Sequence, residues 1–211
     1  MKWEAVFFDF DGVILDSVNV KTKAFASLFQ EYGPEVVQKV VEYHINNGGV
    51  SRFDKFRYYY EKILNQPVNE KIISKLSIQF SNLVIDKVIA SPFIPGAMET
   101  LKILRGNNIP AYIVSGTPEK EIKLIINKKG LSRYFQEVHG SPIKKWVICQ
   151  DILSRKGYNS KNCLFIGDAM SDYEAARKMK VCFLGIIKEY KSSPFPDGTA
   201  LSTVVKLELP A

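Results

Sequence analysis

The sequence predicts an α/β protein with a doubly wound parallel sheet and an inserted helical domain. Short, continuous apolar runs alternate with helical patterns over residues 1–15 and 92–211, which is typical of parallel strands that helices cover on both faces. Residues 16–91 carry helical patterns alone. We therefore expect a core domain made of residues 1–15 and 92–211 and a helical cap domain made of residues 16–91.

The core is expected to contain five strands joined by right-handed helical crossovers. The apolar runs predict strands at 5–8, 109–115, 162–168 and 181–187, with a shorter and weaker candidate at 136–140. Helical patterns between these strands predict helices at about 96–105, 118–129, 144–156 and 171–179.

The inserted segment is expected to form four helices. Ser17 can N-cap the first, which runs through Tyr32 and ends at Gly33-Pro34, and Ser51 can N-cap the third. The second helix is predicted at about 35–46, the third at about 52–64 and the fourth at about 69–89.

The composition is that of an ordinary globular protein. The chain has 211 residues, of which 46% are hydrophobic and 24% charged. No apolar stretch reaches the roughly 18 residues of a membrane span, and the first residues lack the features of a signal peptide. An odd number of cysteines without metal-ligand spacing indicates reduced thiols. We therefore expect a cytoplasmic protein, as a monomer or a weak dimer, without a membrane partner.

The charge pattern does not indicate a nucleic-acid partner. The net charge is +7, but the lysines are scattered and no run of five basic residues occurs. A positive chain is compatible with an anionic small substrate. With only His44 and His139, a zinc site built on histidines or a Ser-His-Asp triad is not expected.

Polar side chains follow three predicted strands. Asp9 ends the first strand and Asp11 lies two residues on, while Ser115 and Asp168 end two others. Ligands bind at the carboxyl ends of the strands in open α/β sheets, so these groups are expected to meet there together with Asp172. A helix N-cap role explains each acid alone, but several converging carboxylates need a counter-charge. Mg²⁺, which prefers oxygen ligands, would supply it.

The segments "FDFDGVILDS", "VSG", "GSPIKK" and "GDAMSD" resemble, in order and spacing, the four motifs of the haloacid dehalogenase-like (HAD) hydrolases. The resemblance covers the whole chain and implies a Rossmann-like core. The helical insert after the first motif is similar to the cap of the phosphoglycolate phosphatase and β-phosphoglucomutase branch. A Mg²⁺-dependent phosphatase acting through an aspartyl phosphate is then expected.

The resemblance implies a role for each residue of the first motif. Asp9 would be the nucleophile and a metal ligand, and Asp11 would be the general acid and base. Asp11 would also ligate the metal through its main-chain carbonyl. Gly12 lets the backbone turn sharply beside the phosphate.

The second and third motifs supply phosphate ligands and a lysine. Ser115 and the amide of Gly116 would bind the phosphate, and Thr117 is expected to N-cap the next helix. The motif spacing favours Lys145 over Lys144 as the lysine that neutralises the transferring phosphoryl group.

The fourth motif and the insert complete the expected site. Asp168 would ligate Mg²⁺ directly, and Asp172 would hold a metal-bound water. The insert segment "GGVSRF" resembles the substrate-specificity loop of this branch, which implies that Arg52 clamps an anionic part of the substrate.

Three alternatives remain beside a phosphatase. A dehalogenase lacks the second acid, because halide leaves without a proton, so Asp11 argues for phosphate chemistry. A β-phosphoglucomutase-type phosphomutase carries a histidine where this chain has Lys21. A non-catalytic binding protein is expected to lose a catalytic acid or the lysine, and none is missing. The expected substrate is a small phosphorylated metabolite: phosphoglycolate, a sugar phosphate or a nucleotide.

Overall fold

A six-stranded parallel sheet forms the centre of the molecule. The computed structural model describes residues 3–188 and 193–207, and the strand order is β3-β2-β1-β4-β5-β6. This confirms the predicted α/β class. The strands are β1 (Ala5–Phe8), β2 (Ala111–Pro118), β3 (Glu137–Ser141), β4 (Cys163–Gly167), β5 (Cys182–Ile186) and β6 (Leu201–Ser202). The last strand, only two residues long, was not expected from the sequence.

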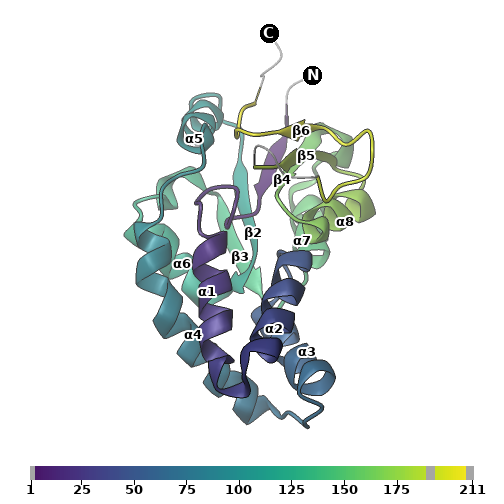
Figure 1. Ribbon diagram of the computed structural model, residues 1–211. Coiled ribbons are helices and arrows are strands. Elements are labelled where there is room, and N and C mark those ends of the chain that lie inside the picture. Colours follow the sequence, from purple (N-terminus) through teal and green to yellow (C-terminus); the bar gives the residue numbers. More distant parts are fainter. Residues whose placement is uncertain (1–2, 189–192, 208–211) are drawn as a thin grey trace.

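Helices cover both faces of this sheet, because successive side chains of each strand point to opposite sides. Val6 and Phe8 of β1 belong to one apolar cluster with helices α5 (Ala97–Gly106) and α6 (Glu119–Lys128). Ala5 and Phe7 belong to a second cluster with α7 (Lys145–Lys156) and α8 (Met170–Met179). The two helix pairs lie on either side of the strands (Figure 1).

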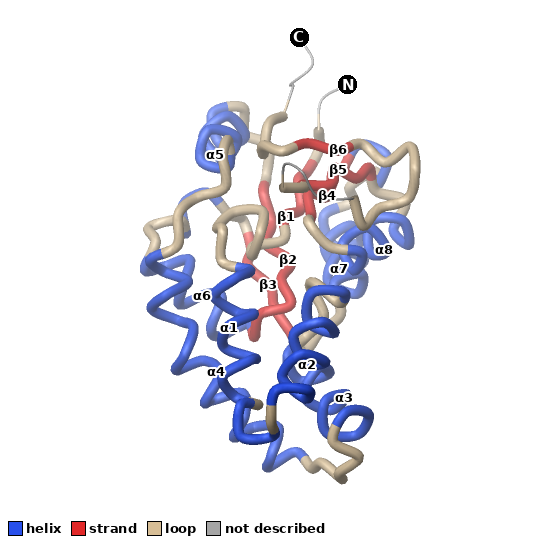
Figure 2. Tube along the Cα trace, viewed as in Figure 1, coloured by secondary structure: helices blue, strands red, loops and turns tan. Residues whose placement is uncertain are grey.

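Between β1 and α5 the chain forms only helices and turns. These elements are α1 (Val18–Leu28), η1 (Gln30–Tyr32), α2 (Pro34–Asn46), α3 (Arg52–Tyr58), η2 (Tyr59–Ile63) and α4 (Glu70–Ala90). They gather at the end of the molecule opposite both chain ends (Figure 2). We call residues 16–91 the cap and the rest the core. The exact domain boundaries stay a prediction. Residues 1–2, 189–192 and 208–211 lie outside the described part of the chain.

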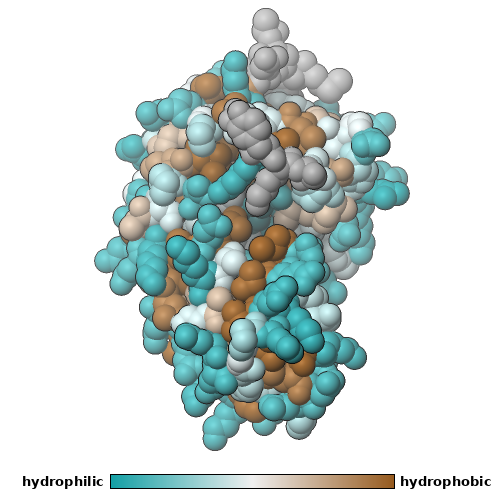
Figure 3. Space-filling view, viewed as in Figure 1, coloured by the Kyte–Doolittle hydropathy of each residue, from teal (hydrophilic) through white to brown (hydrophobic). Residues whose placement is uncertain are grey.

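The cap has an aromatic interior. The ring of Phe25 on α1 packs against Phe56 of α3 and Phe80 of α4, with ring centroids 5.7 and 4.4 Å away. All three side chains are at most 2% exposed. Apolar side chains also reach the surface in the lower half of Figure 3, where the cap lies. Burial of such rings stabilises the packing of the cap helices against one another.

The N-terminus of α3 is capped as the sequence predicts, whereas that of α1 is not. The Ser51 hydroxyl accepts a hydrogen bond from the amide of Phe53 at 3.2 Å. Ser17 precedes α1 but makes no such side-chain bond. Within the described residues, no helix is long and apolar enough to cross a membrane.

Candidate active site

Three strands bring polar groups to one edge of the sheet. Asp9 follows β1, which lies between β2 and β4, and Asp168 follows β4. Because the strands are parallel, their carboxyl ends meet at the same edge. One carboxylate oxygen from each of Asp9, Asp168 and Asp172 lies within 4.8 Å of the others. The structure therefore brings together the three acids that the sequence singled out at strand ends and in the first turn of α8.

Lys145 stands at the centre of these acids. Its ammonium group lies 2.9 Å from Asp9 Oδ2 and donates a hydrogen bond to Asp172 Oδ1 at 2.6 Å. Burial alone would lower the pKa of this lysine, but Asp172 and Asp9 raise it above its ordinary value, so the side chain stays charged. Lys144 is exposed. Of the two candidate lysines, the structure thus places Lys145 against the acids.

The single positive charge of Lys145 does not neutralise three ionised carboxylates. Burial and then the charges of Asp9 and Asp172 raise the pKa of Asp168 well above its usual range. Burial, followed by Asp9, likewise raises the pKa of Asp172, although Lys145 opposes it. These shifts mean that an additional positive charge would stabilise the ionised carboxylates. Oxygen donors around a partly exposed acid fit a hard divalent cation such as Mg²⁺.

Asp168 and Asp172 differ in whether their carboxylate oxygens are free to bind that cation. Asp172 is fully buried, and its oxygens accept hydrogen bonds from Lys145 and from the amide of Ala169, the latter at 3.2 Å. Among the described residues, no hydrogen bond to the Asp168 carboxylate is found. Asp168 therefore has free oxygens for direct ligation, whereas Asp172 is better placed to orient its neighbours.

Gly12 is required where the chain turns beside Asp168. Its φ of +80° belongs to the left-handed region that side chains disfavour. A Cβ atom at this position would lie 2.0 Å from Asp168 Oδ2. Glycine thus allows both the turn after the first motif and the close approach of Asp168 to it.

The side chain of Asp11 is held outside the cluster of three acids. Its carboxylate accepts hydrogen bonds from Ser17 at 2.6 Å, from Thr117 at 3.1 Å and from the ammonium of Lys21. Burial would raise the pKa of Asp11, but the charge of Lys21 and the three hydrogen bonds outweigh it, so the pKa lies below its ordinary value. This carboxylate is fixed in orientation by side chains of the cap and of β2.

These contacts correct two sequence predictions. Ser17 and Thr117 were expected to N-cap helices, but both hydroxyls bind Asp11 instead. Thr117 lies within β2, and Pro118 takes the N-cap position of α6. Lys21, which the sequence marked only as the residue in place of a histidine, bridges Asp11 and Thr117. A buried carboxylate outcompetes a local helix cap because it offers a charged acceptor.

The cap touches the core directly above the site. The hydroxyl of Ser171, in the fourth motif, donates to the carbonyl oxygen of Gly48 at 3.0 Å. A Cβ on Gly49 would lie 2.9 Å from Lys145 Nζ, and one on Gly116 would lie 2.4 Å from the Gly49 carbonyl oxygen. The loop before α3 therefore closes over the residues expected to bind phosphate.

Ser115 lies beneath that loop. Its side chain is 1% exposed, and its hydroxyl accepts a hydrogen bond from the amide of Thr117 at 3.1 Å. Together with the 3% exposure of Asp9, this shows a closed arrangement in which Asp9 and Ser115 are screened from water.

Arg52 is already paired in this arrangement. Its guanidinium contacts Glu121 of α6 at 2.5 Å and Ser81 of α4 at 2.9 Å, and stacks over the Phe80 ring. Arg52 and Glu121 are both nearly buried. The pair joins the cap to the core. Contact between Arg52 and a substrate stays a prediction, and it would require this ion pair to rearrange.

Lys55 and His44 form a buried pair in the cap that no sequence motif marks. Lys55 lies one turn after Arg52, and its ammonium is 2.8 Å from His44 Nδ1. The sequence shows a lysine within a helix, which is usually solvated. Packing among the cap helices buries it to 2% exposure, with its ammonium 5.6 Å from the centroid of the Phe25 ring on α1.

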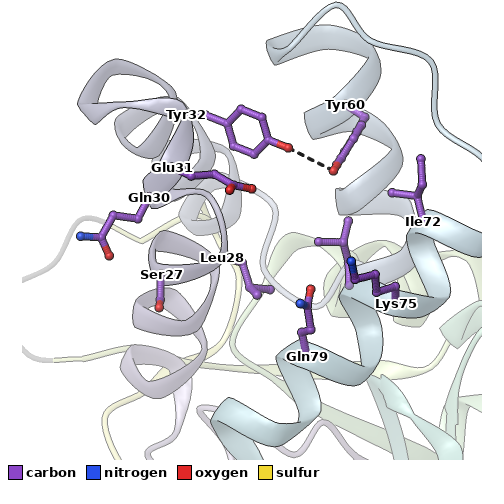
Figure 4. Close-up of a pocket in the computed structure, with 10 residues that line it drawn as sticks. Ser27, Leu28, Gln30, Glu31, Tyr32, Tyr60, Ile72, Lys75 and Gln79 are labelled. Atoms are coloured by element: carbon purple, nitrogen blue, oxygen red, sulfur yellow. Dashed lines mark hydrogen bonds between the residues drawn. The ribbon is translucent and has the colours of Figure 1, made fainter.

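A separate pocket lies within the cap. Its volume is about 760 Å³, and residues of α1, η1, η2 and α4 line it, with the Tyr32 and Tyr60 hydroxyls 3.3 Å apart (Figure 4). None of its lining residues is one of the site residues predicted from the sequence. We assign no chemistry to it.

The model of a hydrolase family, haloacid dehalogenase-like hydrolase, matches residues 3–180. This match spans most of the chain and includes all four motifs. The protein belongs to the haloacid dehalogenase-like hydrolases. The resemblance noted from the motifs is thereby confirmed.

Named relatives in this family are phosphatases. The chain is 26% identical over 188 residues to phosphoglycolate phosphatase 1 of Pseudomonas aeruginosa, covering 82% of this chain and 65% of that protein. It is 24% identical over 189 residues to the phosphoglycolate phosphatase of Synechococcus elongatus, covering 83% and 80%. Family membership and these relatives support a phosphatase activity.

Solved structures of HAD proteins share the fold. A hydrolase from Pseudomonas syringae superposes with a TM-score of 0.75 at 19% identity, covering 93% of this chain and 91% of that one. The β-phosphoglucomutase of Clostridium difficile gives 0.73 at 21% identity, covering 88% and 85%. These likenesses establish the architecture alone.

Proposed function

We propose that this protein is a Mg²⁺-dependent phosphatase that hydrolyses a small phosphorylated metabolite through an aspartyl phosphate on Asp9. The arrangement around Asp9 carries the proposal. This buried carboxylate contacts Lys145 at 2.9 Å and shares its surroundings with Asp168 and Asp172. Its second oxygen accepts a hydrogen bond from the amide of Phe10 at 2.7 Å, which leaves Oδ2 directed toward the lysine.

Each residue then has a chemical task. Asp9 attacks phosphorus, and Lys145 neutralises charge on the phosphoryl oxygens. Asp11 gives a proton to the leaving oxygen and afterwards takes one from the attacking water. Ser115 and the Gly116 amide bind the remaining phosphate oxygens. A bound Mg²⁺, held by Asp9, Asp168 and the Asp11 carbonyl, would offset the repulsion between carboxylates and phosphate.

The surroundings of Asp11 favour the second of its two proton transfers. Its hydrogen bonds to Ser17, Thr117 and Lys21 fix the carboxylate beside β2. The lowered pKa favours the ionised form, which suits the base that activates water. The ammonium of Lys21, in direct contact with the carboxylate, stabilises this ionised form.

A phosphomutase of the β-phosphoglucomutase type is the alternative. A solved relative of that name has the same fold, at 21% identity. Against it, Lys21 stands where that branch carries a histidine, and its ammonium pairs with Asp11. A phosphatase releases inorganic phosphate, whereas a mutase returns an isomeric sugar phosphate. A non-catalytic binding protein would do neither.

The test is a turnover assay. The purified protein is incubated with Mg²⁺ and phosphoglycolate, glucose phosphates or nucleoside monophosphates, and phosphate release is measured beside isomer formation. We expect release from at least one compound, none in EDTA and none from Asp9→Asn. Isomer formation would favour the mutase, and equal release by Asp9→Asn would contradict the assignment. A cytoplasmic location and a monomeric or weakly dimeric state remain predictions.

A further inference from the structure

Arg52 and Glu121 form a buried ion pair between the cap and the core. Arg52 begins α3 in the cap, and Glu121 lies in the first turn of α6 in the core. Their side chains are 4% and 5% exposed, and the guanidinium lies 2.5 Å from Glu121 Oε1. Two buried charges are tolerated only when each is paired, so opening of the cap would separate them and bring both into water.

Ser81 of α4 connects the two charged groups. Its hydroxyl accepts a hydrogen bond from Arg52 at 2.9 Å and donates one to Glu121 Oε2 at 2.5 Å. Both oxygens of the carboxylate are therefore bound, and α4 and α6 lie side by side at this contact (Figure 1). We call Arg52, Ser81 and Glu121 the latch. Because the chain itself supplies each of these groups, the latch needs no substrate to form.

The latch restrains the loop that closes over the site. Arg52 lies three residues after Gly49, and Glu121 lies five residues after Gly116. The Gly49 carbonyl oxygen approaches Gly116 so closely that a Cβ on Gly116 would lie 2.4 Å from it. Three residues span at most about 11 Å and five at most about 18 Å, so neither glycine can move far from the other while the latch is formed.

We propose that the latch holds the cap closed over Asp9 and Ser115 independently of substrate, and that Glu121 is a positioning residue that acts through Arg52. This inference rests on the proposed function, because it assigns the latch to the closed form that reacts. Removal of one partner leaves a charge buried and unpaired in the closed form, whereas water solvates that charge in the open form. Removal of both charges should restore closure, since a neutral replacement of a buried ion pair costs little.

Hydrogen–deuterium exchange with mass spectrometry tests the latch without any turnover. The full chain is compared in Mg²⁺ as wild type, Arg52→Met, Glu121→Gln and the variant that carries both substitutions. Lys123→Met, which breaks an exposed ion pair with Glu119 on the same core helix, is the matched control.

The amides of residues 47–50 and 115–117 should report opening of the cap. Each single variant should raise their exchange rates at least about tenfold, because an unpaired buried charge favours the open form. The double variant and Lys123→Met should stay within about threefold of wild type. The rates in β1 and β4 should not change, because the core stays folded.

Turnover of p-nitrophenyl phosphate, which carries no second anion, tests the positioning role. Both single variants should lower kcat/KM at least about threefold, and the double variant should regain most of the loss, since only the closed form reacts. If Arg52 acted by binding a distal anion of the substrate instead, Arg52→Met would leave this reaction unchanged, and that result would overturn the proposal.

Fast exchange in the double variant as in the single variants, or fast exchange that extends to β1 and β4, would also overturn it. Ser81→Ala keeps both charges and replaces the charge variants if these do not fold. It should speed exchange at residues 47–50 at least about threefold, and unchanged exchange would refute the latch. If the variants show the expected exchange pattern while wild type hydrolyses nothing, the phosphatase is refuted and the latch stands.

Discussion

Asp168 and Asp172 lie four residues apart but have different surroundings. Asp172 accepts hydrogen bonds from Lys145 and from the Ala169 amide, so its oxygens are occupied. The carboxylate of Asp168 has no such donors among the described residues. We therefore expect the two acids to have different tasks, direct ligation of Mg²⁺ for Asp168 and orientation of neighbouring groups for Asp172.

This difference predicts unequal effects on Mg²⁺ affinity. Asp168→Asn should weaken Mg²⁺ binding by about 100-fold or more, because a direct ligand loses its charge. Asp172→Asn should weaken it by about tenfold, since it acts through its neighbours. Calorimetric titration of both variants with Mg²⁺ measures this order. An equal or larger loss in Asp172→Asn would show that the two roles are reversed.

Lys55 makes stability depend on pH. Burial, then Lys21 and Lys145, lower its pKa from 10.5 to about 7 in the folded protein. Between these values the unfolded chain binds a proton that the folded chain has lost, so the free energy of unfolding rises with pH across the window. Below the lower value the lysine is charged in both states, and its burial costs stability in full.

Replacing this lysine should therefore stabilise the ligand-free protein near neutral pH. Lys55→Met is expected to raise the free energy of unfolding at pH 7, by at most roughly 5 kcal/mol, and the gain should shrink toward about pH 10. Urea unfolding at several pH values measures it, with Lys62→Met as the control. A gain that does not change with pH, or a loss at pH 7, would mean that Lys55 is not a buried cation.

At the scale of elements, the loop before α3 and the end of β2 determine how closely the cap approaches the core. Gly49 has a φ of +70°, and Gly116 lies directly under its carbonyl group. The Ser171 hydroxyl holds the same loop through Gly48. Closure of this kind excludes water and completes the site.

A single methyl group should prevent that closure. In Gly116→Ala the new Cβ would lie 2.4 Å from the Gly49 carbonyl oxygen, so the cap must stay apart from the core. We expect kcat/KM for phosphoglycolate to fall at least about tenfold, with a thermal unfolding temperature within a few degrees of wild type. Gly106→Ala, where nothing lies within 4 Å of the new atom, is the matched control. Full activity of Gly116→Ala would show that catalysis does not need the closed form.

The sequence predicts most elements because their signals are local. The run "AVFF" and the segments "IPAYIVS" and "CLFIG" give β1, β2 and β4, since buried parallel strands are continuously apolar. The strand β6 was missed because two residues carry no periodic pattern. Ser17 failed as a helix cap because its hydroxyl binds the carboxylate of Asp11, six residues earlier in the chain, which is a charged acceptor.

At the scale of the whole molecule, motif spacing predicts which residues meet at the sheet edge of the core. It does not predict which side chains pair within the cap or between the cap and the core. Asp9, Asp168 and Lys145 converge because parallel strands end at one edge. The pairs of Arg52 with Glu121 and of Lys55 with His44 depend on how the cap helices pack and rest on the core. No single segment of sequence encodes that packing, so Arg52 was predicted to clamp a substrate anion, its ion pair with Glu121 was not foreseen, and Lys55 was overlooked.

In the proposed mechanism, Asp9 accepts the phosphoryl group and Asp11 later activates the attacking water. In Asp11→Asn the aryloxide of an aryl phosphate still leaves without proton assistance, but the second step lacks its base. The phosphoryl group should then remain on the enzyme.

Rapid mixing of Asp11→Asn with p-nitrophenyl phosphate and Mg²⁺ tests this most directly. We expect a burst of nitrophenolate stoichiometric with the enzyme, followed by slow turnover. Borohydride trapping and peptide mass spectrometry should then find residue 9 reduced to homoserine, in a reaction that Asp9→Asn abolishes. A burst whose phosphoryl group maps to another residue, or steady phosphate release with no trapped species and no loss in Asp9→Asn, would contradict the account.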